Sequence, residues 1–385
     1  MQDSNPGLIT SSVGGVGFNV ALANHYSLNS KNLTNKSRLV SALGDDIAGA
    51  GILTLLKDYG IDHNGVKTLS GCKTAQYVAS IDSNGHLLLA SADMRIIESP
   101  QCVDHIVSEI GKSQPKLIIV DCNLLKNGLD AVLEAASSLP ITPRIIVEPT
   151  SAPKLSRLVE VNTSRLKVYP QNLILMITPT AEELAVIHSS FGKREFFDDY
   201  DSWFPLLDLM GIDSLFREKM VSLAGKNEAM KHMLEKGIVQ QAVQILPYIP
   251  KILVKLGSRG CVLFSLNTNV NDYKSVPTTS PFKPTFTLIS KGRNYEEGKT
   301  LGITIEYFAV PPENANLSVV DVTGAGDTLL GCLVALLAQN DWLTDGVELL
   351  EQEWGKWEGI YKSQVASGLT IESSQAVSEA IRTMK

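Results

Sequence analysis

The sequence predicts an α/β fold in which a mostly parallel sheet is flanked by helices. Short apolar runs rich in β-formers alternate with segments of helical spacing, such as residues 47–59 and 129–139. This alternation is typical of parallel strands that are joined by helices. Ligands bind beyond the carboxyl ends of such strands, so the loops that follow them are the expected place for a site. The expected buried strands are residues 38–43, 116–121, 144–148, 173–178 and 251–256.

A hairpin interrupts the alternation early in the chain. Residues 74–81 and 86–93 are strand-like, and the Asn84-Gly85 pair between them is a strong hairpin signal. A hairpin at this point suggests a small lid, about residues 66–98, that lies over the site. A plain edge hairpin is an equally good interpretation of the pattern.

Two later stretches also lack the alternation. Residues 189–250 are rich in helix formers and have little strand character, which predicts a helical insertion. Residues 285–300 are polar and predict a loop. We find no clear linker, so the chain is expected to form a single domain over residues 1–385.

Composition argues against several classes of function. The net charge is −7 and the isoelectric point is near 5.5, so no basic field would attract a nucleic acid. No apolar run approaches the length that spans a membrane. None of the six histidines has a second histidine three to five residues away, the usual spacing of paired zinc ligands. The five cysteines are scattered, as expected for reduced thiols in a cytoplasmic protein: Cys72, Cys102, Cys122, Cys261 and Cys332.

The most informative motif lies near the end of the chain. Residues 321–327 read Asp-Val-Thr-Gly-Ala-Gly-Asp, and an apolar helical segment follows directly. Gly324 and Gly326 allow the backbone to approach a ligand, and Gly324, Ala325 and Gly326 would offer N–H groups at a helix N-terminus that bind an anion. Asp327 could then accept the proton of an incoming hydroxyl. A helix cap is the alternative role for Asp327, but capping does not explain the small residues before it.

A second glycine cluster lies near the start. Residues 13–21 read Val-Gly-Gly-Val-Gly-Phe-Asn-Val-Ala and lack both the third glycine of a dinucleotide fingerprint and the Lys of a Walker A loop. Gly14 and Gly15 would let the backbone approach a polyhydroxy compound. Asn19 offers both a donor and an acceptor to a sugar hydroxyl. A flexible turn without a ligand is the alternative.

Together the two motifs resemble the ribokinase, or PfkB, family of carbohydrate and nucleoside kinases. Residues 44–49, Gly-Asp-Asp-Ile-Ala-Gly, look like the family's Gly-x-Asp-x-x-Gly segment. Residues 255–260, Lys-Leu-Gly-Ser-Arg-Gly, resemble its nucleotide-side strand and turn. The resemblance implies a ribokinase-like fold and the transfer of the γ-phosphate of ATP to a sugar hydroxyl.

The resemblance also implies roles for individual residues. Asp327 would be the general base, and Gly324, Ala325 and Gly326 the anion hole. The substrate would lie near Gly14, Gly15, Asn19 and Asp46. ATP would lie near Lys255, Gly257, Ser258, Gly260, Thr323, Ser363 and Gln364.

Members of the family use Mg²⁺, and many respond to a monovalent cation such as K⁺. The family's Asn-x-x-Glu motif, which helps to organise Mg²⁺, reads Thr180-Ala181-Glu182-Glu183 here. Glu183 is therefore the candidate metal residue, while Thr replaces Asn at position 180. Thr180 and Glu183 could also form a helix capping box.

Softer signals are similar to pseudouridine kinases. They are residues 4–7 (Ser-Asn-Pro-Gly) running into residues 11–21, residues 148–151 (Glu-Pro-Thr-Ser) and residues 369–378. They imply that the 5′-hydroxyl of pseudouridine is the acceptor. In fungi such kinases occur fused to a pseudouridine-5′-phosphate glycosidase, so a fusion or association with that enzyme is expected, and a homodimer is also considered.

Besides Thr180, a second departure from the family is expected to matter. The family usually begins with a strand that carries an Asp for the sugar hydroxyls, and that strand is not found ahead of residues 4–7. Two alternatives to a pseudouridine kinase stay open. One is a ribose, fructose or adenosine kinase of the same family, and the other is a non-catalytic relative that acts as a binding module.

Overall fold

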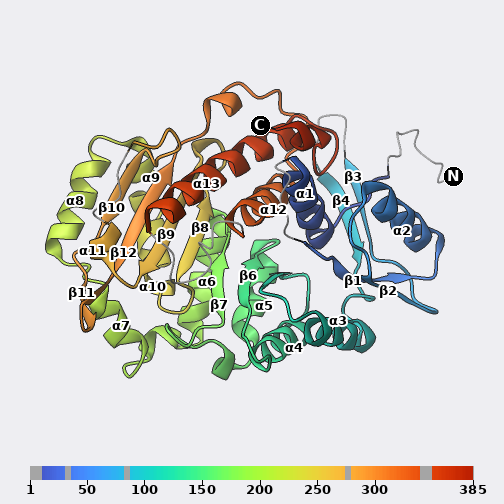
Figure 1. Ribbon diagram of the computed structural model, residues 1–385, viewed down its shortest axis with the longest axis horizontal. Helices are drawn as coiled ribbons and strands as arrows, with labels where there is room; N and C mark the ends of the chain where they lie inside the picture. Colours follow the sequence, from blue (N-terminus) through green and yellow to red (C-terminus); the bar gives the residue numbers. More distant parts are fainter. Residues whose placement is uncertain (1–10, 31–35, 82–86, 274–278, 339–348, 385) are drawn as a thin grey trace.

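The computed structural model describes residues 11–30, 36–81, 87–273, 279–338 and 349–384. Its largest sheet runs in the order β10-β12-β9-β8-β7-β6-β5, with β11 paired to β12 (Figure 1). The four strands at one side pair in parallel: β5 (Leu117–Asp121), β6 (Arg144–Glu148), β7 (Ile174–Ile177) and β8 (Lys251–Lys255). These are four of the five strands that the sequence predicts, so the α/β fold class is confirmed.

The other side of the sheet is antiparallel. It consists of β9 (Cys261–Asn267), β12 (Lys299–Phe308), β10 (Phe286–Ile289) and β11 (Arg293–Glu296). The prediction of a loop at 285–300 is therefore wrong. The short edge strands carry little apolar periodicity because one side of each is open, and they are held by pairing with the long strand β12 and by packing of Phe286 on Tyr307.

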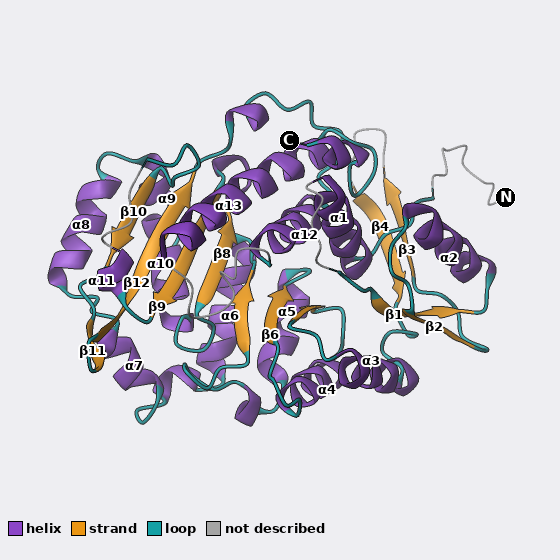
Figure 2. Ribbon diagram, in the orientation of Figure 1, coloured by secondary structure: helices purple, strands orange, loops and turns teal. Residues whose placement is uncertain are grey.

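Helices cover both faces of the sheet (Figures 1 and 2). Strand side chains alternate between the faces, so Ile145 and Val147 pack on one side and Ile146 on the other. One face is covered by α1 (Val16–Ser30), α12 (Ala325–Leu337) and α13 (Leu349–Ile371). The opposite face is covered by α4 (Lys126–Ser137), α5 (Ala152–Glu160), α6 (Ala181–Lys193) and α10 (Ile238–Ile245).

The predicted helical insertion is helical throughout. Between the end of α6 and β8 the chain forms α7 (Trp203–Leu209), α8 (Ser214–Ala224), α9 (Glu228–Glu235) and α10. Its apolar residues join the large core under the sheet, including Trp203 and Met230. The insertion therefore extends that core, on the face opposite α1 and α12.

The early part of the chain forms two small sheets. Strand β1 (Val40–Gly44) pairs in parallel with β2 (Gly65–Leu69), and α2 (Ile47–Tyr59) connects them. Strands β3 (Gln76–Ile81) and β4 (Leu87–Asp93) form the predicted hairpin, with the Asn84-Gly85 turn outside the described residues. The hairpin pairs only within itself in the described part of the chain, so the structure gives it a sheet of its own rather than a place at an edge of the large sheet.

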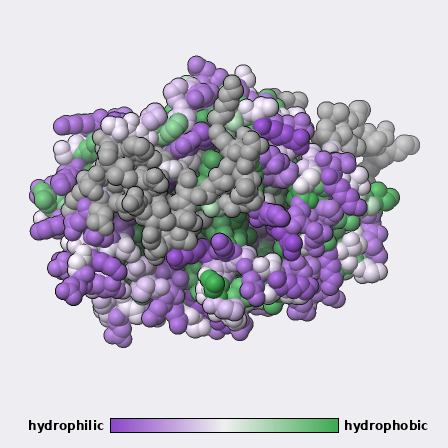
Figure 3. Space-filling model, in the orientation of Figure 1, coloured by the Kyte–Doolittle hydropathy of each residue, from purple (hydrophilic) through white to green (hydrophobic). Residues whose placement is uncertain are grey.

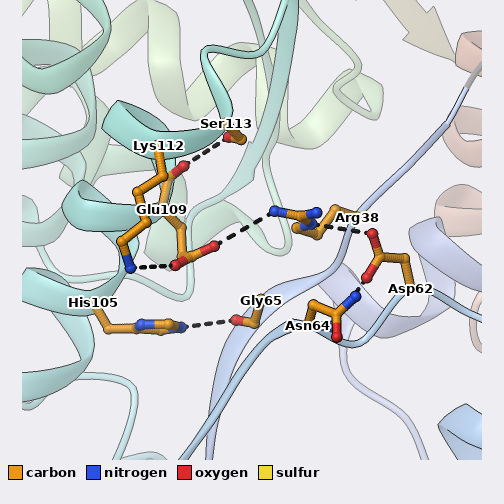
Figure 4. Close-up of polar contacts among 8 residues, drawn as sticks. All are labelled: Arg38, Asp62, Asn64, Gly65, His105, Glu109, Lys112 and Ser113. Atoms are coloured by element: carbon orange, nitrogen blue, oxygen red, sulfur yellow. Dashed lines mark hydrogen bonds and ion pairs between the residues drawn. The ribbon is translucent and has the colours of Figure 1, made fainter.

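A polar cluster fastens the β1–β2 unit to α3 (Pro100–Ser113), as Figure 4 shows. Arg38 reaches Asp62 at 3.1 Å and Glu109 at 3.6 Å, which joins the chain next to β1 and β2 to the helix. His105 Nε2 lies 2.8 Å from the carbonyl oxygen of Gly65. These contacts hold the β1–β2 unit against α3, the helix that precedes β5 of the large sheet.

The face of the molecule in Figure 3 is mainly polar where the described residues form it. Hydrophilic side chains dominate the face in Figure 3, and apolar ones gather there in small patches. Within the described ranges, no helix has the length and apolar character needed to cross a bilayer. All five cysteines are free thiols, and all but Cys72 are buried.

Candidate active site

The parallel strands bring polar side chains together at their carboxyl ends. Asp121 ends β5, Glu148 ends β6 and Lys255 ends β8, while Thr178 directly follows β7. Glu148 is only 4% exposed and Thr178 is fully buried. Two carboxylates, a hydroxyl and an ammonium are thus gathered at the carboxyl ends of four neighbouring strands.

The glycine-rich motif forms the N-terminus of α12. Gly324 is the N-cap with φ 78°, and a methyl group there would lie 1.9 Å from the carbonyl oxygen of Ala376. Only glycine fits this approach. The described structure provides no protein acceptor for the N–H groups of Gly326 and Asp327, so the start of the helix can bind an anion.

Asp327 does not cap its own helix. It is the third residue of α12, whose N-cap is Gly324, so the Asp327 side chain does not stand at the cap position. Its carboxylate instead accepts a hydrogen bond of 2.8 Å from Asn19 Nδ2, which lies on α1. The role as a helix cap is therefore not supported, and the structure brings the two predicted motifs together.

Burial sets the proton affinity of Asp327. Desolvation raises its pKa above the ordinary value, while the Asn19 hydrogen bond and the nearby Lys255 ammonium lower it. The Asp121 carboxylate raises the pKa of Asp327 further. A carboxylate with a raised pKa is a stronger base, which suits proton abstraction from a hydroxyl.

Asn19 and Asp121 border the same space. Asn19 is 4% exposed, and its Oδ1 has no hydrogen-bond partner in the described structure. A methyl group on Gly17 would lie 3.7 Å from Asp121 Oδ2, so this carboxylate faces the first turn of α1. Burial also raises the pKa of Asp121.

Lys255 lies next to the anion-binding turn. Its Nζ forms an ion pair of 2.9 Å with Glu148 Oε1, and a methyl group on Gly326 would lie 3.1 Å from that nitrogen. Thr178 donates its hydroxyl to the other Glu148 oxygen. Burial raises the pKa of Glu148 to about 7, against the lowering effect of Lys255.

The other predicted glycines lie in exposed or tight turns. Gly14 and Gly15 are exposed just before α1, and a methyl group at either would meet nothing within 4 Å. Gly257 and Ser258 are exposed in the turn after β8. Gly260 has φ 86°, and a methyl group there would lie 2.2 Å from the carbonyl oxygen of Phe308, so it is required for the turn itself.

Thr323 is exposed in the loop before α12, where its N–H donates to Asp321. The helix α13 passes this region, since Ser367 donates to the carbonyl of Ala325. Ser363 and Gln364, one turn earlier in α13, are buried and bonded internally, to Gly359 and Ala309. The structure therefore gives neither of these two side chains an open surface.

Both carboxylate oxygens of Asp46 accept hydrogen bonds from within the protein. One of its oxygens accepts from the N–H of Gly49 at 2.8 Å and from the Thr74 hydroxyl at 2.6 Å, and the other accepts from the Thr74 N–H at 2.9 Å. These bonds from Thr74 and Gly49 lower the pKa of Asp46. Asp46 thus caps α2 and fastens it to the segment that enters the hairpin.

We expect Asp46→Ala to lower the melting temperature by several degrees because the helix loses its cap and Thr74 loses its acceptor. Thermal unfolding followed by circular dichroism measures this. The matched control is Asp58→Ala, an exposed Asp on the same helix, which should unfold like the parent. Equal melting temperatures for the two variants would show that Asp46 has no structural role.

Thr180 and Glu183 form the capping box at the start of α6. Thr180 N–H donates to Glu183 Oε2 at 2.8 Å, and Glu183 N–H donates to the Thr180 hydroxyl at 3.2 Å. The N–H of Lys255 donates to Pro179, so the box lies beside the end of β8. Among the described residues, no three His, Cys, Asp or Glu side chains cluster as a metal site.

Sequence reasoning missed two residues as site candidates. Asp121 and Glu148 were seen only as strand ends and as part of a subfamily pattern. The available signal was an acidic residue at the carboxyl end of an otherwise apolar strand.

Comparison with known proteins identifies a family for the chain. Residues 3–154 match the model of the pfkB family carbohydrate kinases. The chain carries a pfkB-family domain. The predicted family is thus confirmed, and the predicted enzyme class, a carbohydrate or nucleoside kinase, agrees with it. The matched residues include the Asn19 and Asp46 motifs, whereas Asp327 lies beyond them.

Two curated relatives metabolise pseudouridine according to their names. The chain is 29% identical over 372 residues to the pseudouridine-metabolizing bifunctional protein of Schizosaccharomyces pombe, covering 96% of this chain and 42% of that protein. It is 33% identical over 152 residues to the pseudouridine kinase of Escherichia coli, covering 39% of this chain and 45% of that protein. The matched segments span less than half the length of each of these relatives.

Solved structures share the ribokinase-like fold. The ribokinase of Giardia lamblia superimposes with a TM-score of 0.58 at 16% identity, covering 99% of this chain and 91% of that one. The Arabidopsis thaliana ribokinase, complexed with ribose and ATP, gives 0.55 at 14% identity, covering 100% and 91%. The predicted ribokinase-like fold is confirmed.

Proposed function

We propose that the protein transfers the γ-phosphate of ATP to the 5′-hydroxyl of pseudouridine. The observation that carries this proposal is the partly buried Asp327 carboxylate at the start of α12, where the N–H groups of Gly326 and Asp327 have no protein acceptor among the described residues. Phosphoryl transfer to an alcohol requires a base for the hydroxyl proton and a site that stabilises the developing negative charge. Asp327 and the first turn of α12 would supply these two parts.

In this proposal the substrate hydroxyl approaches Asp327, which accepts its proton as the oxygen attacks the phosphoryl group. Gly324, Ala325 and Gly326 form the anion hole for the developing negative charge. Asn19 orients Asp327 through the 2.8 Å hydrogen bond and offers its unpaired Oδ1 to the substrate. Residues Gly14, Gly15 and Asp46 border the substrate.

The nucleotide lies along the turn after β8 and the loop before α12. Lys255, Gly257, Ser258, Gly260 and Thr323 are the proposed contacts, and we retain Ser363 and Gln364 as the part of α13 that borders the nucleotide. Mg²⁺, when bound, neutralises phosphate charge, with Glu183 as the proposed protein residue near it. A monovalent cation such as K⁺ is proposed as an activator from the family resemblance alone.

Two observations support pseudouridine as the acceptor. Both named relatives act on this nucleoside according to their names, and the Schizosaccharomyces pombe protein matches 96% of the chain. That protein is bifunctional, and the match covers 42% of it, so we propose that this kinase works fused to or associated with a pseudouridine-phosphate glycosidase. A homodimer and a cytoplasmic location are further proposals, the latter supported by five unpaired thiols.

Release of ADP from Mg-ATP tests the proposal. The purified protein is offered pseudouridine, uridine, ribose, fructose and adenosine in parallel, and we expect turnover with pseudouridine alone. Turnover confined to ribose, fructose or adenosine would replace pseudouridine as the substrate but keep the reaction. Nucleotide binding without turnover on any acceptor would support the binding module instead.

A further inference from the structure

A buried ion pair lies where the parallel strands end. Glu148 is 4% exposed, and the side chain of Lys255 is 14% exposed. Thr178 supplies a second hydrogen bond, so both oxygens of Glu148 have a partner. A buried ion pair often contributes less to stability than apolar residues of the same size would, so stability alone does not explain this one.

The position of the ammonium indicates a role. Lys255 Nζ lies against Gly326, at the turn where the N–H groups of Gly326 and Asp327 have no acceptor among the described residues. The positive end of the α12 dipole and the ammonium therefore point at the same place. Two positive features repel each other unless an anion lies between them, and the proposed reaction brings a phosphoryl group to this turn.

The orientation of the ammonium depends on Glu148. A lysine side chain has four rotatable carbon bonds, so its charge is placed only if a partner holds it. Glu148 is that partner, and it is fixed in turn by Thr178, which directly follows the neighbouring strand β7. Gly326 leaves the space that a larger residue would fill.

We infer that Lys255 is a further catalytic residue that contacts the transferred phosphoryl group, and that Glu148 is a positioning residue that holds the Lys255 ammonium over the first turn of α12. This inference rests on the proposed function. Only an ionised Glu148 fixes the ammonium. The charged or polar groups that face it are Lys255, Thr178, Asp327 and Cys122, whose thiol stays neutral because burial raises its pKa.

The inference predicts a division between kcat and nucleotide affinity. Lys255→Met should lower kcat by about 100-fold, as the loss of one charge-stabilising donor does. The same change should weaken ATP binding about 10-fold and ADP binding less than about 3-fold, because the ammonium meets the terminal phosphate. If Lys255→Met changed neither the affinity for ATP nor the affinity for ADP, the inference would be overturned. Lys255→Arg, which keeps the charge but moves it, carries the test if Lys255→Met does not fold.

Glu148 is tested by the pH profile. Burial raises the pKa of Glu148 to about 7. Above that pH the ionised carboxylate holds the Lys255 ammonium in place, and below it the protonated carboxyl releases the ammonium. The parent kcat should therefore rise through this range. Glu148→Gln should lower kcat about 10-fold and remove that part of the rise, while ATP affinity stays within about 3-fold. An unchanged kcat and an unchanged profile would contradict the positioning role.

A second buried ion pair provides the matched control. Glu306 and Lys356 form an ion pair of 2.7 Å and are 0% and 2% exposed, on β12 and α13. Glu306→Gln should lower the melting temperature without changing the pH profile or the ATP-to-ADP affinity ratio. If the parent binds ATP without transferring phosphate, the proposed function fails while the affinity ratio still decides the place of Lys255. A parent that binds no ATP would overturn both.

Discussion

Asp327→Asn is expected to lower kcat by about 100-fold or more while leaving ATP affinity nearly unchanged. The amide keeps the size of the carboxylate but cannot accept the proton of the hydroxyl. Asp327 is the partly buried carboxylate in the first turn of α12, and Gly324, not Asp327, is the N-cap of that helix. Steady-state kinetics and calorimetric titration with ATP measure the two quantities.

The matched control for this change is Asp321→Asn in the same loop. Asp321 is exposed and accepts a hydrogen bond from the Thr323 N–H, which an Asn oxygen can also accept. This variant should keep nearly the parent kcat. A near-normal kcat in Asp327→Asn would remove Asp327 as the base, whatever the control does.

Gly324→Ala is expected to have the largest effect on stability. The residue has φ 78°, and the added methyl group would lie 1.9 Å from the Ala376 carbonyl oxygen. A left-handed conformation costs an alanine roughly 1–2 kcal/mol, and overpacking adds roughly 1–3 kcal/mol. We therefore expect a loss of about 2–5 kcal/mol in the free energy of unfolding, and the loss of kinase activity with the displaced turn. Chemical denaturation measures the first and ADP release the second.

Gly298→Ala separates the two contributions. Gly298 has φ 74°, but a methyl group there meets nothing within 4 Å, so only the conformational cost remains. That variant should lose about 1–2 kcal/mol and keep its activity. If Gly324→Ala is no worse than Gly298→Ala, the close approach of Ala376 does not hold the anion-binding turn.

Much of the fold was predictable because local periodicity decides it. The helix expected at 47–59 matches α2, and four predicted strands form the parallel half of the sheet. The predicted strand at 38–43 also exists, but it pairs with β2 in a separate sheet. The failure at 285–300 has a physical reason, since short edge strands depend on pairing with β12 and carry little pattern of their own.

The candidate site was predictable where a motif is local. The Gly324–Asp327 turn forms a helix start as expected, and Asn19 reaches Asp327 across 308 positions of sequence. No local signal could give that distance, because it depends on the packing of α1 on α12. The importance of Glu148 was hidden for the same reason, since its partner Lys255 is 107 positions away.

Some residues carry both a structural and a proposed functional role. Asp46 and Glu183 are each used by helix caps, and Ser363 is buried and bonded to its own helix. Their structural roles follow from hydrogen bonds that are present without any ligand. Residues 4–7, which belong to the subfamily pattern, lie outside the described part of the chain.

Transfer of phosphate to the nucleoside is the central claim, and phosphorus-31 spectroscopy tests it most directly. The protein is mixed with Mg-ATP and pseudouridine, and the phosphate signals are followed over time. We predict that the γ-phosphate signal is replaced by a phosphomonoester coupled to the two 5′ protons of the sugar. A spectrum that shows only ATP, or ADP with free phosphate, would contradict the account.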